Sequence, residues 1–213
     1  MAMVMPIMPR KPVFSDKLQE LKQLAQALAK NVTGGLQSQL QDLINNPQKV
    51  AALIEEKSPR LSRELLSVAS NMTDPFVVGM GLQISKLEED LVEVTLPQRW
   101  KNLTDSGDFH TGALCTLAEF TSKIYWDRHL SSSAARRRVR KLDAQILQTP
   151  RGNLVARYSL SSSEREAFMF KLRTEQEPMI DALVKIYDSQ DKLIAEVTID
   201  WQFAAQLALG SSK

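Results

Sequence analysis

One run of the sequence limits the possible folds more than any other. Residues 111–129 have helical spacing and carry apolar side chains on nearly every side, namely Ala113, Leu114, Leu117, Ala118, Phe120, Ile124, Tyr125 and Trp126. A helix that is apolar all round is typical of a protein interior. No apolar run in the chain approaches the ~20 residues that span a bilayer. The sequence therefore predicts a buried central helix, and it leaves Glu119, a carboxylate in the middle of that helix, to be explained.

The segments around this helix alternate polar and apolar residues with period two, which is typical of strands. Predicted strands cover 81–86, 91–96, 141–148, 153–160, 180–187 and 192–203. A short helix is predicted at 163–174, with Ser163 as its N-cap. Because the apolar face of an antiparallel sheet must be covered, we predict an α+β domain in which a curved antiparallel sheet wraps around the central helix.

The chain before residue 72 has a helical pattern instead. Apolar residues are spaced by three and four from residue 18, and the pair Gly34–Gly35 interrupts them. We expect a disordered leader at 1–14, a helical extension at 15–71, the sheet domain at 72–205 and a tail at 206–213. The extension is expected to pack on the main domain or on a second subunit.

Composition excludes several classes of protein. The single cysteine, Cys115, excludes an internal disulfide, and one cysteine with two histidines is too few for a structural zinc site. The Gly-rich phosphate-binding motifs and the GxSxG hydrolase motif are absent. The formal net charge of +2 argues against nucleic acid as the main partner. With no signal-peptide pattern at the start, we predict a cytoplasmic protein without a metal ion or a transmembrane segment.

The run HTGALCTLAE, in this order of predicted elements, resembles the hotdog-fold thioesterases. It looks most like the phenylacetyl-CoA thioesterase-like branch and its uncharacterised relatives, which carry an Asn, then His-Gly-Gly-Ala, then a carboxylate nine residues after the His. The matching positions are Asn102, His110 to Ala113, and Glu119, and the resemblance covers about residues 73–203. Thr111 stands where the family has Gly.

The resemblance implies a hotdog fold that hydrolyses acyl-CoA or another acyl thioester. Coenzyme A would be part of the substrate, and no separate cofactor is expected. It implies that Glu119 is the general base or nucleophile and that Asn102 and His110 belong to the site. The backbone N–H groups of Thr111 and Gly112 would polarise the thioester carbonyl, as donors at a helix N-terminus can.

Helix geometry adds a prediction about assembly. Glu119 lies about half a turn out of phase with His110 and ~13 Å further along the axis. The two ends of the motif can meet around a thioester if two central helices run antiparallel across a two-fold axis. We therefore predict a homodimer, or a dimer of dimers, with composite sites.

Each of these residues also has a structural interpretation. Glu119 is four residues before Lys123, the favourable orientation for a helical ion pair. His110 could orient its loop or cap the helix, and the assignment of Asn102 rests on a spacing longer than is usual in the family. Cys115 is interpreted as a small core residue, since no base lies near it in the sequence.

Two further sets of residues are candidates for substrate binding. Thr121 and Ser122 could line the acyl pocket, although hydroxyls in a buried helix often bond back to the i−4 carbonyl. The basic run 135–142, ARRRVRKL, precedes the third predicted strand and is expected to be a loop. Its arginines could contact the phosphates of coenzyme A, could simply be solvated, or could bind nucleic acid; they are Arg136, Arg137, Arg138 and Arg140.

Two rival functions stay open. One is a non-catalytic hotdog protein that binds acyl groups or acyl-CoA, which the Thr at position 111 and the added helical extension favour. The other is a hydratase or dehydratase of the same fold, which pairs His with a carboxylate at other spacings.

Overall fold

The computed structural model describes residues 59–60, 62–63, 66–67, 76–130 and 135–205. The predicted leader, the tail and most of the helical extension lie outside these residues. The described residues between 59 and 67 are helical, as predicted. All described residues belong to one compact unit.

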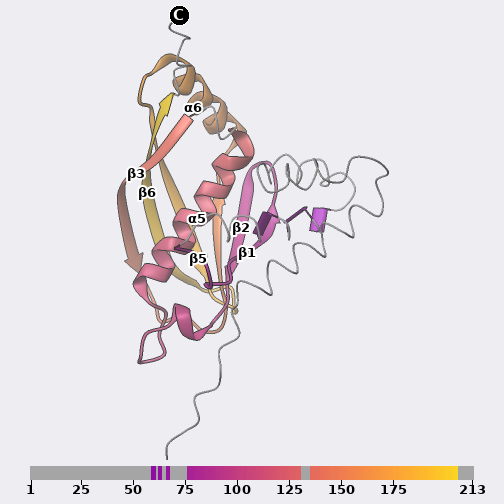
Figure 1. Ribbon diagram of the computed structural model, residues 1–213, viewed down its shortest axis with the longest axis vertical. Helices are drawn as coiled ribbons and strands as arrows, with labels where there is room; N and C mark the ends of the chain where they lie inside the picture. Colours follow the sequence, from indigo (N-terminus) through magenta and orange to yellow (C-terminus); the bar gives the residue numbers. More distant parts are fainter. Residues whose placement is uncertain (1–58, 61, 64–65, 68–75, 131–134, 206–213) are drawn as a thin grey trace, which may run out of the picture. The chain divides into compact units, whose positions relative to one another are not determined.

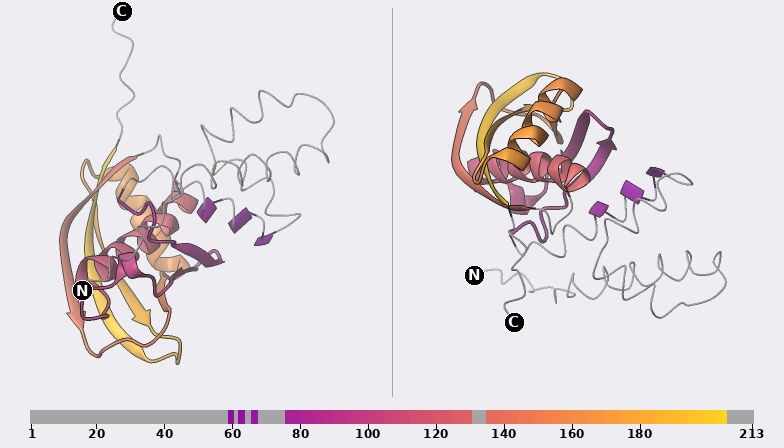
Figure 2. Two further views of the ribbon diagram at one scale, coloured as in Figure 1. Left: turned by 60° about the horizontal axis from the view of Figure 1, so that its bottom comes forward. Right: turned by 90° about the horizontal axis from the view of Figure 1, so that it is seen from above.

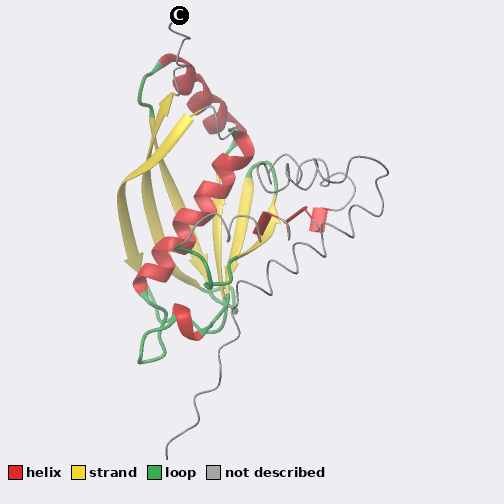
Figure 3. Cartoon of the chain, in the orientation of Figure 1, coloured by secondary structure: helices red, strands yellow, loops and turns green. Residues whose placement is uncertain are grey.

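The described part of the chain contains one antiparallel sheet of six strands in the order β1-β2-β4-β5-β6-β3 (Figures 1 and 3). The strands are β1 (Gln83–Leu87), β2 (Leu91–Leu96), β3 (Ala135–Ile146), β4 (Leu154–Ser159), β5 (Met179–Tyr187) and β6 (Leu193–Ala205). Helix α5 (Thr111–His129) follows β2 and a 3-10 turn, η1 (Trp100–Asn102), and α6 (Ser162–Thr174) lies between β4 and β5. This is the predicted order of elements and the predicted α+β architecture.

Helix α5 crosses the concave face of the sheet, which curves around it (Figure 2). It packs on β2, β4, β5 and β6. Strand alternation supplies the other side of the core: in β4, for example, Leu154, Ala156 and Tyr158 point inward and are buried. The core therefore forms where the period-two and helical apolar patterns face each other.

Strand β3 corrects one prediction. The strand begins at Ala135, not at residue 141, so the basic run expected to be a loop forms its first half. The run pairs with β6 through Arg137 opposite Phe203 and Val139 opposite Trp201, followed by a bulge. The run has arginines on both faces of the strand, so its sequence shows no alternation of polar and apolar residues. Pairing with β6, and not a local pattern, makes this segment a strand.

The two edges of the sheet differ among the described residues. At the β1 edge, the Ser67 hydroxyl accepts the Ile84 N–H (2.9 Å), and Leu66 packs against the core. At the β3 edge, none of the residues 136–146 is buried. An exposed edge strand is a template for pairing with another chain.

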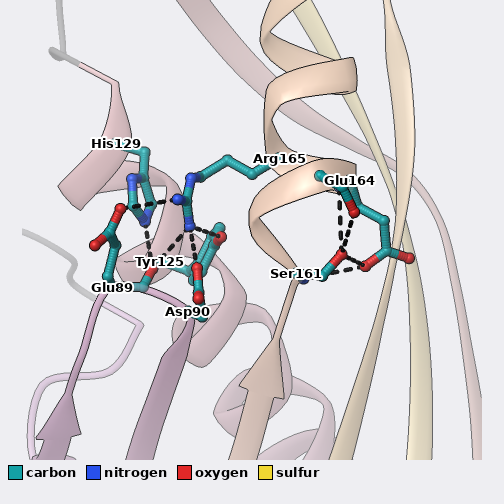
Figure 4. A network of polar contacts seen from close by, with 8 residues as sticks. Glu89, Asp90, Tyr125, His129, Ser161, Glu164 and Arg165 are labelled. Atoms are coloured by element: carbon teal, nitrogen blue, oxygen red, sulfur yellow. Dashed lines mark hydrogen bonds and ion pairs between the residues drawn. The ribbon is translucent and has the colours of Figure 1, made fainter.

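Helix α6 lies at the C-terminal end of α5. Phe168 contacts Trp126 and Phe203, each with 5.0 Å between ring centroids. Figure 4 shows a set of polar contacts made by the same helix, in which Arg165 bonds to the carboxylates of Glu89 and Asp90 in the β1–β2 turn and to Tyr125 of α5. Aromatic packing and these bonds together hold α6 over one end of the central helix.

The N-cap of α6 is Ser161, and the predicted cap, Ser163, is wrong. The Ser161 hydroxyl accepts the Glu164 N–H and the Glu164 carboxylate accepts the Ser161 N–H, which makes a capping box (Figure 4). Residues 161–163 are all serine, and a capping box needs the Glu three residues after the cap. Only Ser161 has this spacing to Glu164.

Replacing Ser161 with Ala is expected to lower the free energy of unfolding by about 1 kcal/mol, the usual value of a lost N-cap. Ser163→Ala is the matched control and is expected to change it by less than half as much. Urea unfolding of the two variants beside the wild type measures the difference. Equal effects of the two substitutions would contradict the assignment of the cap.

Candidate functional site

The loop before α5 is tied to the rest of the domain at both ends. Phe109 is buried and forms an isolated bridge with Leu103, and the His110 N–H donates to the Asn102 carbonyl (2.9 Å). The loop between them closes on itself, since the Thr104 N–H donates to the Asp108 carbonyl (2.7 Å). These contacts fix the direction in which α5 begins.

Asn102 acts inside this framework. It is fully buried, and its amide Nδ2 donates to the carbonyls of Met80 (3.0 Å) and Pro97 (2.8 Å). Both donor hydrogens are therefore used to join two chain segments. Through these two bonds, Asn102 positions the loop before α5. Its own Oδ1 remains a buried acceptor without a partner among the described residues.

His110 is the N-cap of α5. Its Nδ1 accepts the Gly112 N–H (3.0 Å), while the ring itself is exposed. Of the two interpretations of this histidine, the structure shows the cap. One consequence is that the Gly112 N–H, expected to polarise a thioester, already has a partner within the chain.

The Thr111 N–H differs from the Gly112 N–H in its hydrogen bonding. The structure records no partner for it among the described residues, and Thr111 is exposed at the first position of the helix. Uncommitted N–H groups at a helix N-terminus attract negative charge. Thr111 therefore retains the donor that the resemblance assigns to it.

The interpretation of Glu119 as a carboxylate held in apolar surroundings is wrong, because its side chain is exposed. The helix is not buried on every side: its outer face carries Thr111 and Glu119, both exposed, with the half-buried Cys115 between them. Glu119 lies about 12 Å along the axis from Thr111, at about 1.5 Å per residue. Within one chain the carboxylate and the Thr111 N–H are thus too far apart to act on one carbonyl group.

Further along α5, Asp127 contacts two cations. Its carboxylate lies 3.4 Å from Lys123 Nζ and forms an ion pair with Arg137 of β3. Both partners of the Arg137 pair are largely shielded, with side chains 15% and 10% exposed. This pair could not be predicted from the sequence, because Asp127 belongs to a helix and Arg137 to a segment that was expected to be a loop.

Thr121 and Ser122 lie on the opposite side of α5, in the core. The Thr121 hydroxyl donates to the Leu117 carbonyl (2.6 Å), and the Ser122 hydroxyl donates back to carbonyls of its own helix and accepts the Trp201 indole N–H (3.0 Å). Both side chains are fully buried. Both hydroxyls thus donate to carbonyls four residues earlier in the helix, as the structural interpretation of these residues expected.

Cys115 shows no sign of activation. Burial raises the pKa of its thiol, and the neighbouring Glu119 raises it further. A thiol with a raised pKa is a poor nucleophile near neutral pH. This agrees with the interpretation of Cys115 as a packing residue.

Strand geometry distributes the arginines of the basic run over two faces of the sheet. Arg137 points toward α5, whereas Arg138 and Arg140 both donate to Gln202 Oε1 on the other face (2.7 and 3.3 Å). Arg136 is exposed. The four side chains therefore do not converge on one phosphate group in this chain, and their contact with coenzyme A stays a prediction.

The structure brings Asn102, His110, Thr111 and Gly112 together at the start of α5 and leaves Glu119 further along the same helix. No group of His, Cys, Asp and Glu residues in the described ranges could hold a metal ion. The described helices include none that is long and apolar enough to cross a membrane.

The fold is similar to those of several solved structures. PA5026 from Pseudomonas aeruginosa, a protein of unknown function described as a probable thioesterase, is 20% identical with a TM-score of 0.61, over 67% of this chain and 95% of its own. OLEI01261 from Chlorobaculum tepidum TLS, of unknown function, is 16% identical with a TM-score of 0.59, over 70% and 97%. The thioesterase HI1161 from Haemophilus influenzae is 18% identical with a TM-score of 0.54, over 70% and 94%. These likenesses confirm the hotdog fold.

The comparison with curated proteins gave no match. A family model matches residues 62–203, which spans the sheet, both helices and the candidate site. The chain belongs to the family described as a domain of unknown function, DUF4442.

Proposed function

We propose that this protein hydrolyses acyl thioesters, acyl-CoA among them, at a composite site shared by two copies of the chain. The observation that carries the proposal is the pair of groups on the outer face of α5. Thr111 offers an uncommitted N–H at the helix N-terminus, and Glu119 offers an exposed carboxylate about 12 Å along the axis. Two of the solved structures with this fold, PA5026 and HI1161, are described as a probable thioesterase and a thioesterase.

A second copy would complete the site. An antiparallel α5 from a partner places its Thr111 beside the first chain's Glu119, and the two-fold axis repeats the arrangement. Among the described residues β3 has no strand on its outer side, which favours such an assembly. Its inward residues Val139, Leu142 and Ala144 are only partly buried, which also favours it. These residues would gain cover from the partner.

The chemistry follows from the two groups. Glu119 takes a proton from a water molecule, and the resulting hydroxide attacks the carbonyl carbon of the thioester. The Thr111 N–H of the partner stabilises the negative charge that develops on the carbonyl oxygen. The C–S bond then breaks, and the leaving thiolate takes up the proton that Glu119 had removed from the water. The products are a carboxylic acid and a free thiol, and the Glu119 carboxylate is restored. No metal ion or separate cofactor takes part in this proposal.

One observation favours a second candidate, a protein that binds acyl thioesters without hydrolysing them. His110 occupies the Gly112 N–H, so the oxyanion would receive one donor from this helix terminus and not two. Losing one such donor costs other hydrolases about 10²–10³ in rate.

A panel of acyl-CoA substrates from acetyl to palmitoyl, with a thiol-reactive dye to detect the released thiol, separates the two candidates. The thioesterase proposal expects turnover on at least one chain length, in proportion to enzyme concentration. Thermal stabilisation by acyl-CoA without release of thiol on any chain length would favour the binding protein and exclude hydrolysis.

A further inference from the structure

The turn that leads into the candidate site exposes an aromatic ring between two cations. Arg99 is the N-cap of η1, and Trp100 and Lys101 follow it. Trp100 is 70% exposed, and Lys101 Nζ lies 5.9 Å from the centre of its ring. Arg99 and Lys101 are exposed, and no ion pair is recorded for either within the described residues. The turn lies outside the run HTGALCTLAE, and no pattern in the sequence indicated it.

Both cations rest on bare backbone. Gly79 and Gly81 have φ of +88° and +77°, a conformation that favours glycine. A Cβ at Gly79 would stand 2.6 Å from Lys101 Nζ, and one at Gly81 would overlap the Arg99 guanidinium. A side chain at either glycine would overlap a cation, so the two glycines leave room for Arg99 and Lys101.

The turn is also attached to the candidate site. Asn102, its last residue, bonds through its side chain to Met80, between the two glycines, and through its carbonyl to His110. The two carboxylates of the loop after the turn have other contacts: Asp105 accepts the Ser106 N–H (3.0 Å), and Asp108 accepts the Ser106 hydroxyl (3.5 Å). Asn102, which follows Lys101, is therefore one hydrogen bond away from the N-cap of α5.

We propose that the turn from Arg99 to Lys101 binds the nucleotide end of a coenzyme A thioester. The adenine ring stacks on Trp100, as bases stack on exposed aromatic side chains, and the phosphates pair with Arg99 and Lys101. This inference rests on the proposed function for the identity of the substrate and adds a binding site to it. It differs from the predicted contact through the β3 arginines, which are spread over two faces of the sheet and largely bonded within the chain.

Binding of free coenzyme A to the full chain tests the proposal without requiring hydrolysis. The other two tryptophans, Trp126 and Trp201, are 0% and 3% exposed, so quenching of the exposed emission reports on Trp100. We expect coenzyme A to quench this emission. The double substitution Arg99→Gln and Lys101→Gln should raise the Kd at least tenfold, since each charge-assisted contact is worth about that factor.

A matched control removes two cations elsewhere. Lys171→Gln with Arg173→Gln, both exposed in the last turn of α6, makes the same change in net charge and should leave the Kd unchanged. Trp100→Leu should remove the quenching and weaken binding measured by calorimetry. Equal Kd values for the Arg99/Lys101 variant and the wild type would overturn the proposal. So would 4′-phosphopantetheine binding as tightly as coenzyme A, because that molecule lacks the base.

Kinetics separate this proposal from the proposed function. If acyl-CoA is hydrolysed, the Arg99/Lys101 variant should have a higher KM for acyl-CoA at an unchanged kcat, and its KM for an acyl N-acetylcysteamine thioester, which has no nucleotide, should not change. If nothing is hydrolysed but the variant loses coenzyme A binding, the nucleotide site stands and hydrolysis is refuted. If hydrolysis occurs with the same KM in both proteins, hydrolysis stands and the nucleotide site is refuted.

Discussion

Replacing Glu119 with Gln is expected to lower kcat for acyl-CoA hydrolysis by a factor of about 10²–10⁴, the usual contribution of a general base. The amide keeps the size of the side chain and removes its ability to take a proton from water. KM should change little, because the exposed carboxylate is not proposed to hold the coenzyme. Release of thiol from the best substrate of the acyl-CoA panel measures the effect.

The control is Glu166→Gln, an exposed carboxylate on α6, which should leave kcat unchanged. Urea unfolding of both variants separates a chemical effect from a loss of folded protein. A Glu119→Gln variant that is folded and hydrolyses the substrate at the wild-type rate would show that the base lies elsewhere.

The architecture could be predicted because its signals are local and agree with one another. The apolar run that became α5 has the predicted bounds, and the alternation from Leu193 to Phe203 marked β6. The position of each strand in the sheet is not a local property. β3 follows α5 in the sequence but pairs with the last strand, β6, at the edge. Alternation shows that a segment is extended and does not show which segment lies beside it.

The candidate site was predicted less completely, and the reason is orientation. Periodicity showed that the middle of α5 is mostly apolar, but it could not show that Glu119 points away from the sheet while Thr121 and Ser122 point into it. The bond from Gly112 to His110 depends on the conformation of the cap, which spacing does not reveal. The first half of β3 was likewise not predicted as a strand, because its arginines interrupt the apolar alternation on both faces.

Replacing Thr111 with Pro tests the other half of the proposed site. Proline has no N–H, and it is well accepted at the first position of a helix. His110 has φ of −64° and ψ of 131°, a conformation suited to the residue before a proline. The substitution should therefore remove the proposed oxyanion donor with little change in the fold. We expect kcat to fall by a factor of about 10²–10³, whereas Thr111→Ala, which keeps the N–H, should remain active.

Mixing these two inactive variants then asks whether one site draws on two chains. In a dimer of one Glu119→Gln chain and one Thr111→Pro chain, one of the two sites keeps both an intact Glu119 and an intact Thr111 N–H. Subunit exchange at equal amounts makes about half of the dimers mixed, so about a quarter of the wild-type activity should return. If both groups acted from the same chain, every site in the mixture would lack one of them and no activity would return. Recovery of activity would therefore assign the carboxylate and the N–H to different subunits, because the 12 Å between them along α5 cannot be closed within one helix.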